Sequence, residues 1–472
     1  MLALRPVRVE PVALTTLAAV AGATPPSADP SVSGITHDSR AVQPGDLYAA
    51  LPGAHLHGAD FGAEAVERGA VAALSDRPVS GLPTIITADP RRVLGPVSAR
   101  VYGDPSHRLA IYGVTGTNGK TTTAYLLEQG LRAAGRTTGL IGTIESHVAG
   151  EVVPSVRTTP EATELQALLA VMVERGVQAC AMEVSSHALA LGRVAGTRYG
   201  AALFTNLSQD HLDFHTDLED YFAAKASLFR PAFTDLAVID VTDAFGARLA
   251  DDVEGAGGVR VVRVGADVTA GTQLIGDFNA RNAALAVAAL TATGIDAAVA
   301  AEGVAALAGV PGRTERIDAG QPYLAVVDYA HTPEAVTRLL AAMRPLTAGR
   351  LVVVLGCGGD RDAGKRPLMG AAAATGADRA VFTDDNPRSE SGADIVAAML
   401  AGVPDDRRDR VSVERDRAAA IARAVTGLGP GDTVVVAGKG HEKGQDVGGV
   451  VTAFDDREVL RRSINDAQAV PR

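Results

Sequence analysis

The stretch TGTNGKTTTAYLLEQGLRAAG at residues 115–135 constrains the fold more than any other part of the chain. It follows the apolar run LAIYGV, and its second half has the apolar spacing of a helix that stops at a glycine. A strand, a glycine loop and a helix in this order predict a phosphate-binding loop, whose backbone N–H groups surround phosphates at a helix N-terminus. We therefore expect an α/β fold with a parallel sheet.

The phosphate-binding loop assigns roles to the two residues that follow its last glycine. Lys120 is expected to reach the β and γ phosphates of a nucleoside triphosphate, and Thr121 to bind magnesium through its hydroxyl. The spacing is imperfect, because Val114 stands where the first glycine of the usual motif belongs. An ordinary glycine turn that caps a helix is the alternative, but it leaves Lys120 unexplained.

Lysine is rare in this chain, which makes each lysine a candidate for a specific role. Arginine supplies nearly all of the positive charge, and the only lysines are Lys120, Lys225, Lys365, Lys439 and Lys443. Lys225, in DYFAAKASLF, would ordinarily be a solvated helix residue. A lysine amine can also react with carbon dioxide to give a carbamate, an anionic metal ligand that a guanidinium cannot form.

Length, charge and cysteine content limit the class of protein. At 472 residues the chain exceeds what one hydrophobic core usually supports, so two or three domains are expected. A net charge of -11 disfavours nucleic acid or an anionic membrane as the main partner, while it allows a local basic cleft for phosphates. Cys180 and Cys357 lie far apart, which gives no disulfide framework or zinc ribbon and favours a reducing compartment.

The start of the chain has some features of a secretory signal, namely arginines, a short apolar run and small residues. We reject that interpretation, because Glu10 and Pro11 precede the run and Thr15 and Thr16 interrupt it. No stretch approaches the ~20 continuous apolar residues of a membrane-spanning helix.

Three blocks follow from the pattern of apolar runs and breaks. Residues 1–107 hold short runs broken by glycine and proline and predict a small α/β domain. Residues 108–312 contain the phosphate-binding loop and the buried-strand runs ACAMEV and AALFTN. Residues 313–472 alternate apolar runs with alanine-rich helical stretches, which predicts a second parallel sheet. Its strands end in polar residues, at the edge where open α/β sheets bind ligands.

Carboxylates and histidines in the middle block indicate a metal site. Glu183 ends a buried-looking strand, where its charge needs a cation or hydrogen bonds. His211 and His215 have the i, i+4 spacing of a helical zinc pair, which permits a zinc hydrolase as an alternative. Against it, the acid expected by the usual zinc protease motif is absent and the phosphate-binding loop would have no role. A polar surface turn is a third interpretation of these histidines.

The chain resembles the Mur ligases in a series of stretches that keep the family's order along nearly its whole length. They begin with THDSRAVQPGDLYAALPG and continue with TGTNGKTTT, RTTPE, MEVSSHALALGRV, TNLSQDHLDFH, YFAAKASLF, GDFNARNAALA, VPGRTERID, VDYAHTPEA, GCGGDRDAGKRPLMG, TDDNPRSE and AGKGHEKGQ. So many motifs in one order make the resemblance specific.

The resemblance implies a three-domain α/β ligase with an N-terminal UDP-binding domain, a central ATPase-like domain and a C-terminal Rossmann-like domain. Such an enzyme uses ATP to join the D-Glu γ-carboxylate of UDP-N-acetylmuramoyl-L-Ala-D-Glu to a diamino acid through an acyl phosphate, in peptidoglycan precursor synthesis. ATP and Mg²⁺ would be its cofactors. We expect a cytoplasmic monomer without nucleic-acid or membrane partners.

The resemblance also assigns residues to four binding tasks. Nucleotide contacts would be Gly116, Thr117, Asn118, Gly119, Lys120, Thr121, Thr122, Asn282, Arg313 and Asp328. Metal ligands would be Thr121, Glu183, His211 and Lys225 as its carbamate, and the catalytic residues would be Lys120, Glu183, His211 and Lys225. The UDP-linked substrate would contact Ser39, Thr158, Thr159, Ser185 and Arg193. The amino acid would contact Arg361, Asp385, Asn386, Pro387, Arg388, Gly438 and Glu442.

Three details refine these implications. In DNPR, Arg388 can pair with a second carboxylate in a bidentate manner, which favours diaminopimelate over L-lysine; a surface arginine after a turn proline is the alternative. Leu191 stands where some relatives have a glutamine, which puts one polar substrate contact in doubt. The segment near residues 262–275 looks shorter than in relatives, so we expect some strand structure there to be trimmed.

Three alternatives to a diaminopimelate-adding ligase stay open at this point. An L-lysine-adding variant differs only in its amino acid. A folylpolyglutamate-type ligase shares GTNGKT and the acyl phosphate, but DNPR and the early DSR argue against it. A non-catalytic, nucleotide-sensing relative is disfavoured by the presence of Lys120, Glu183, His211 and Lys225.

Overall fold

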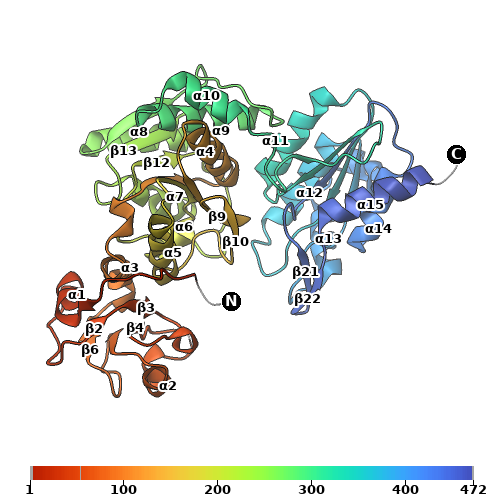
Figure 1. Cartoon of the computed structure of the whole chain (residues 1–472). Coiled ribbons are helices and arrows are strands. Elements are labelled where there is room, and N and C mark those ends of the chain that lie inside the picture. The colour runs from red at the N-terminus through yellow and green to blue at the C-terminus, as the bar shows by residue number, and fades with distance from the viewer. Residues whose placement is uncertain (1–3, 54, 470–472) are drawn as a thin grey trace.

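Three parallel sheets follow one another along the chain in the computed structural model, which describes residues 4–53 and 55–469. Figure 1 shows them as three bodies in chain order, with the blue C-terminal body beside the central one. The predicted α/β fold class with parallel sheets is therefore confirmed. The domain boundaries near residues 107 and 312 stay predictions.

The N-terminal body is built on a four-stranded parallel sheet in sequential order. Its strands are β3 (Gly34–Thr36), β4 (Asp46–Ala49), β5 (Ala72–Ser75) and β6 (Thr84–Ile86), and its helices are α1 (Leu14–Val20), α2 (Gly62–Glu67) and α3 (Pro90–Val101). A short antiparallel pair, β1 (Val12–Ala13) and β2 (Ser31–Val32), precedes the sheet. The apolar run near the start of the chain forms α1, whose Leu14 and Leu17 are buried in this body's core.

The central body is built on an eight-stranded sheet with the order β10-β9-β8-β11-β7-β12-β13-β14. In chain order the strands are β7 (Ala110–Thr115), β8 (Thr138–Ile141), β9 (Glu145–Val148), β10 (Glu151–Pro154), β11 (Ala179–Glu183), β12 (Ala201–Phe204), β13 (Leu236–Asp240) and β14 (Arg260–Val264). Strand β9 pairs antiparallel with both β8 and β10, and the other neighbouring strands of this sheet pair in parallel. Because β11 and β12 flank β7 in parallel, the segments after all three strands meet at one edge.

Helices cover both faces of the central sheet. One face carries α4 (Lys120–Ala133), α9 (Asp277–Ala292) and α10 (Ala297–Ala305); the other carries α5 (Ala162–Glu174), α6 (Ser186–Ala190), α7 (Leu218–Ala226) and α8 (Ala244–Ala256). Strand β11 shows why both faces are apolar. Cys180 and Met182 face the α5 side, while Ala179 and Ala181 face the α4 side.

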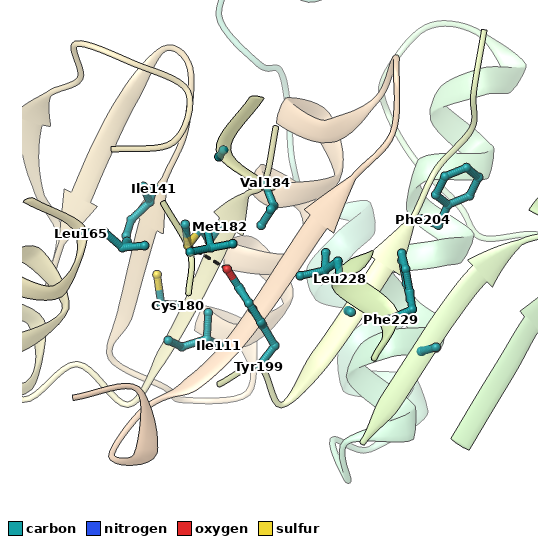
Figure 2. Close-up of a cluster of buried hydrophobic side chains, with 14 of the residues drawn as sticks. Ile111, Ile141, Leu165, Cys180, Met182, Val184, Tyr199, Phe204, Leu228 and Phe229 are labelled. Carbon is teal, nitrogen blue, oxygen red and sulfur yellow. Dashed lines mark hydrogen bonds between the residues drawn. The ribbon is translucent and has the colours of Figure 1, made fainter. Parts of the chain in front are cut away.

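The core on the α5 side is closely packed (Figure 2). The Tyr199 hydroxyl donates to Met182 Sδ at 3.9 Å. Ile111 of β7 belongs to the same core cluster. A Cβ at Gly113 would lie 2.6 Å from the Tyr199 ring, so only glycine fits this strand position. The packing therefore fixes β7, the strand that leads into the phosphate-binding loop.

The C-terminal body has a six-stranded sheet with the order β15-β16-β20-β17-β18-β19, in which only β15 is antiparallel. Its strands are β15 (Glu315–Arg316), β16 (Leu324–Asp328), β17 (Leu351–Leu355), β18 (Arg379–Phe382), β19 (Val411–Val413) and β20 (Thr433–Ala437). One face carries α11 (Pro333–Met343), α12 (Lys365–Gly376) and α13 (Gly392–Ala401), and the other α14 (Arg417–Val425) and α15 (Asp456–Ala469). A hairpin of β21 (Gly444–Val447) and β22 (Val450–Ala453) extends from this body.

The segment that looked shortened in the sequence connects β14 to α9 directly. Residues 265–276 contain no strand, and β14 is the edge of the central sheet. No helix within residues 4–53 and 55–469 combines the length and the apolar character needed to cross a membrane.

A fully buried ion pair ties α14 to α15. The Arg417 guanidinium donates to both carboxylate oxygens of Asp456 at 2.7 Å, and both side chains are 0% exposed. Arg417→Met alone is expected to destabilise the protein by about 3–5 kcal/mol, because Asp456 would be left as an unpaired buried charge. Thermal unfolding followed by circular dichroism measures the change.

The matched control for this prediction is Arg423→Met, at an exposed position of the same helix. The double variant Arg417→Met/Asp456→Leu should regain part of the lost stability, because Asp456 is then no longer left as an unpaired buried charge. A single variant as stable as the control would contradict the prediction.

Candidate active site

The phosphate-binding loop lies between β7 and α4, as the sequence predicts. Gly119 has φ +87° and a Cβ there would lie 2.5 Å from Asn282 Oδ1, so the loop needs glycine at this point. Lys120 is the first residue of α4, and its Nζ donates to the carbonyl oxygens of Gly116 at 2.8 Å and Thr117 at 2.9 Å. The loop N–H groups, the helix N-terminus and this amine form an anion-binding site.

Glu183, at the end of β11, is fully buried beside the loop. Its Oε2 accepts hydrogen bonds from the hydroxyls of Thr121 at 2.9 Å and Thr143 at 3.1 Å, and its Oε1 accepts from the Thr143 N–H at 2.7 Å. A carboxylate and a hydroxyl this close are oxygen donors of the kind magnesium prefers, and magnesium usually takes few protein ligands. Thr121 and Glu183 therefore fit a magnesium ion.

Lys225, on α7, is buried against the same loop. Its Nζ donates to the Gly116 carbonyl oxygen at 2.8 Å, so two lysine amines converge on one backbone oxygen. Burial first, and then the neighbouring Lys120, hold the pKa of Lys225 well below its ordinary value, while the carboxylate of Asp210 acts in the opposite direction. An uncharged amine is the form that reacts with carbon dioxide.

The two histidines of the alternative zinc-hydrolase interpretation do not lie on a helix. His211 has a left-handed φ of +57°, and α7 begins only at Leu218, so both histidines occupy the preceding turn. His215 Nδ1 lies 3.2 Å from Asp220 instead. Across the described ranges 4–53 and 55–469, no three His, Cys, Asp or Glu side chains form a group that could hold a metal. The helical zinc pair is therefore wrong.

His211 nevertheless lies at the edge of the phosphate-binding site. Burial lowers its pKa to about 3, although the adjacent Asp210 acts in the opposite direction. The imidazole is therefore neutral at physiological pH, which is the form that binds metals.

Asp210 connects the central and C-terminal bodies. Its carboxylate lies 3.5 Å from His331 Nε2, which follows β16, and 3.7 Å from Lys365 Nζ, at the start of α12. Burial acts to raise the pKa of the nearly buried Asp210, but its neighbours His331, His211 and Lys365 lower it. Lys365 thus has a structural reason to be present, and the C-terminal body closes one side of the site.

A cavity of about 250 Å³ lies between these two bodies. Of the predicted nucleotide contacts, its lining includes Thr117, Asn118, Gly119, Lys120, Thr121, Thr122, Asn282, Arg313 and Asp328. Arg313 donates to Thr121 Oγ1 at 3.0 Å and stacks over the Tyr329 ring at 4.3 Å. Asp328 accepts from the N–H groups of Thr314 and Ala330, while burial raises its pKa.

Four of the five residues expected at the UDP-linked substrate lie close to Glu183. The Thr159 hydroxyl donates to the Glu183 carbonyl at 2.9 Å and accepts from the Ser185 N–H, while Thr158 accepts from Thr143. Arg193 reaches the Thr159 carbonyl oxygen at 3.4 Å. The fifth residue is Ser39, which belongs to the N-terminal body and donates to Glu64 at 2.8 Å. Leu191 directly follows α6 as its C-cap residue, two residues before Arg193.

The residues expected to bind the amino acid follow three neighbouring strands of the C-terminal sheet, β20, β17 and β18. Asp385, Asn386 and Pro387 are buried, and Glu442 accepts from the Asn386 amide at 2.8 Å. A Cβ at Gly438 would lie 2.7 Å from Asp385 Oδ2, so these strand ends are in close contact.

The two arginines of this group differ in their surroundings. Arg388 is half-buried with φ +53°, and its guanidinium donates to the Gly359 carbonyl oxygen at 2.5 Å. Arg361 is exposed, and its guanidinium contacts only the Asp360 carbonyl oxygen among the described residues. Arg388 therefore packs against the edge of the sheet, whereas the side chain of Arg361 lies in solvent.

Three residues at the site carried no predicted role. Thr143 holds Glu183, Lys439 contacts Asn386 and Glu442, and Arg417 Nη1 lies 4.0 Å from Asp385. Lysine rarity singled out Lys439 without assigning it a function. Nothing in the local sequence marks Thr143 or Arg417.

Three successive regions of the chain match models of known protein families. Residues 31–98 match the Mur ligase family catalytic domain, residues 114–271 the Mur ligase middle domain, and residues 312–440 the Mur ligase glutamate ligase domain.

The curated relatives that match nearly the whole chain share one enzyme name. The UDP-N-acetylmuramoyl-L-alanyl-D-glutamate--2,6-diaminopimelate ligase of Streptomyces avermitilis is 52% identical over 98% of both chains, and that of Gloeobacter violaceus is 44% identical over 93% of this chain and 94% of its own. A solved structure of an enzyme of this name is 30% identical, with a TM-score of 0.67 over 98% of this chain and 100% of that chain. The chain belongs to the Mur ligase family.

Proposed function

We propose that the protein is an ATP-dependent ligase that joins 2,6-diaminopimelate to the D-Glu γ-carboxylate of UDP-N-acetylmuramoyl-L-Ala-D-Glu, a step of peptidoglycan precursor synthesis. The observation that carries the proposal is a single cavity with a phosphate-binding loop and a buried carboxylate on one side and the C-terminal sheet on the other. The whole-chain relatives of this name support the choice of substrates.

The chemistry follows from the low reactivity of a carboxylate toward an amine. The γ-carboxylate oxygen attacks the γ-phosphorus of ATP, the bond to the β-phosphate oxygen breaks, and ADP leaves. The amine of diaminopimelate then attacks the resulting acyl phosphate, inorganic phosphate leaves with the bonding electrons, and the nitrogen loses a proton. Catalysis of such a transfer consists mainly of positioning and of neutralising phosphate charge, which are the tasks we assign to Lys120 and Arg313.

Magnesium is the proposed metal cofactor. Thr121 and Glu183 would hold one ion, and His211 with the Lys225 carbamate would help to hold a second. When bound, the metal neutralises negative charge on the phosphates. The oxygen donors around Glu183, the neutral state of His211 and the depressed pKa of Lys225 support these assignments.

The remaining assignments concern the other substrates and the setting. We assign Thr158, Thr159, Ser185 and Arg193 to the muramoyl dipeptide and Ser39 to the uridine end. We further propose a monomer that acts in the cytoplasm, which the two buried free thiols and the net charge of -11 support.

An amino-acid screen tests the proposed function. Purified protein is given ATP, UDP-N-acetylmuramoyl-L-Ala-D-Glu and one amino acid, and phosphate release is measured. Release that needs both the UDP-linked substrate and diaminopimelate is the expected result. Release with L-lysine instead would identify the lysine-adding variant, and release without the UDP-linked substrate would favour a folylpolyglutamate-type ligase. No release with any amino acid would contradict an enzymatic function.

Arg388→Ala is expected to raise the KM for diaminopimelate by about 10²-fold, because a bidentate, charge-assisted pair with the second carboxylate is lost. The KM for ATP should change less than twofold. Initial rates of phosphate release measure both constants. Arg408→Ala, at a side chain 66% exposed on the same body, is the control. An equal rise in both KM values would contradict the assigned role.

A further inference from the structure

Lys439 lies against the residues assigned to the amino acid because of the two glycines beside it. Gly438 has φ +112° and Gly440 φ +55°, both in the left-handed region, so the chain turns sharply on each side of the lysine. A Cβ at Gly440 would lie 2.8 Å from the Tyr329 Cβ, which keeps this turn pressed against the end of β16. The turn directs Lys439 inward, and its side chain is 0% exposed.

The buried amine contacts two residues that we assign to the amino acid. Lys439 Nζ donates to Asn386 Oδ1 at 2.9 Å and to Glu442 Oε2 at 3.0 Å. The Asp446 N–H donates to the same Asn386 oxygen at 3.0 Å. With two donors facing Oδ1, the amide orientation of Asn386 is determined, and its Nδ2 donates to Glu442 Oε2 at 2.8 Å. The three side chains form a closed ring of hydrogen bonds.

The ring leaves defined groups free for a ligand. Both hydrogen bonds to the Glu442 side chain end on Oε2, and Oε1 receives none from residues 4–53 and 55–469. The Glu442 side chain is 31% exposed, so a ligand can approach this carboxylate. Asn386 Nδ2 keeps one further N–H. A fixed carboxylate oxygen suits an ammonium group, and an amide N–H beside it suits a carboxylate, which are the two groups at each end of diaminopimelate.

We propose that Lys439 is a positioning residue that orients Glu442 and Asn386 toward one amino-acid end of diaminopimelate. This inference rests on the proposed function. Lysine suits the position because its compact ammonium carries donors that point to two separate acceptors, whereas arginine presents a planar fork. A chain that otherwise uses arginine thus has a physical reason for lysine here.

Lys439→Met tests the proposal, because methionine has nearly the same length without charge or donors. The KM for diaminopimelate should rise tenfold to a hundredfold, roughly the effect of losing one hydrogen bond to a charged group. The KM values for ATP and for UDP-N-acetylmuramoyl-L-Ala-D-Glu should stay within twofold. Lys443→Met, at the exposed lysine of the same loop, is the matched control. Lys439→Gln, which keeps an N–H donor group but no charge, should give an intermediate rise and serves if the methionine variant does not fold.

A double-mutant cycle separates positioning from a general loss of stability. If Lys439 acts through Glu442, Lys439→Met should add little to the rise in the diaminopimelate KM that Glu442→Gln causes. Additive effects, or a parallel rise in all three KM values, would overturn the proposal. An unchanged diaminopimelate KM in both Lys439 variants would overturn it while leaving the proposed function intact. Failure of the unmodified protein to turn over any amino acid would instead contradict the proposed function and, with it, this inference.

Discussion

Lys120→Ala is expected to lower the rate of phosphate release by about 10³-fold, the scale on which one preorganised charge acts in phosphoryl transfer. Lys120 Nζ lies over the loop at 2.8 Å from the Gly116 carbonyl oxygen, at the N-terminus of α4. Burial lowers the pKa of Lys120, whereas the nearby Glu183 raises it. A bound triphosphate adds negative charge beside the amine and so favours its charged form.

Two measurements distinguish this loss from unfolding. Single-turnover phosphate release reports the chemical step, and thermal unfolding reports the fold. Lys443→Ala serves as the control, because Lys443 is exposed in the C-terminal body. If Lys120→Ala turned over ATP at the rate of the control, the assignment of the phosphate-binding loop would be wrong.

The elements that sequence analysis predicts well are those defined by local pattern. The run LAIYGV, the glycines and the helical spacing after Lys120 appear as β7, the loop and α4. The apolar runs ending at Glu183 and Asp328 are buried parallel strands, because burial on both faces leaves no polar alternation. Strand order depends on packing between distant segments, and local pattern does not determine it.

In the candidate site, too, local motifs could be predicted from the sequence, whereas contacts between distant segments could not. The resemblance to a family supplied the nucleotide contacts, nine of which line the cavity, but not the residues that hold the site residues in place. Thr143 meets Glu183 from 40 positions away, and Lys439 meets Asn386 from 53 positions away, so neither contact is visible in a window of sequence. The zinc-pair alternative was wrong because a local pattern was misleading. The i, i+4 spacing of His211 and His215 suggests a helix, but the left-handed backbone of His211 excludes one there.

Lys225→Ala is expected to reduce turnover by about 10³-fold or more, because no carbamate would then help to hold the second magnesium ion, which would neutralise the charge that develops on the phosphates. The environment of Lys225 favours this modification. The amines of Lys120 and Lys225 both donate to the Gly116 carbonyl oxygen, and two positive charges there would repel in a buried site, which favours the uncharged, reactive form of Lys225. Conversion of Lys225 to a carbamate replaces that repulsion with attraction between an anion and Lys120.

A carbamate, unlike an ammonium, can be replaced by a small carboxylate from solution. Acetate or formate should therefore restore part of the phosphate release of Lys225→Ala, with a rate that rises with the concentration of the acid. Lys120→Ala should gain nothing from the same acids, because it lacks a cation and not an anion. Removal of carbon dioxide from the buffer should slow the unmodified enzyme, while the rescued variant stays unaffected. Rescue by an alkyl amine in place of the acids would mean that Lys225 acts as an ammonium, and the carbamate assignment would fail.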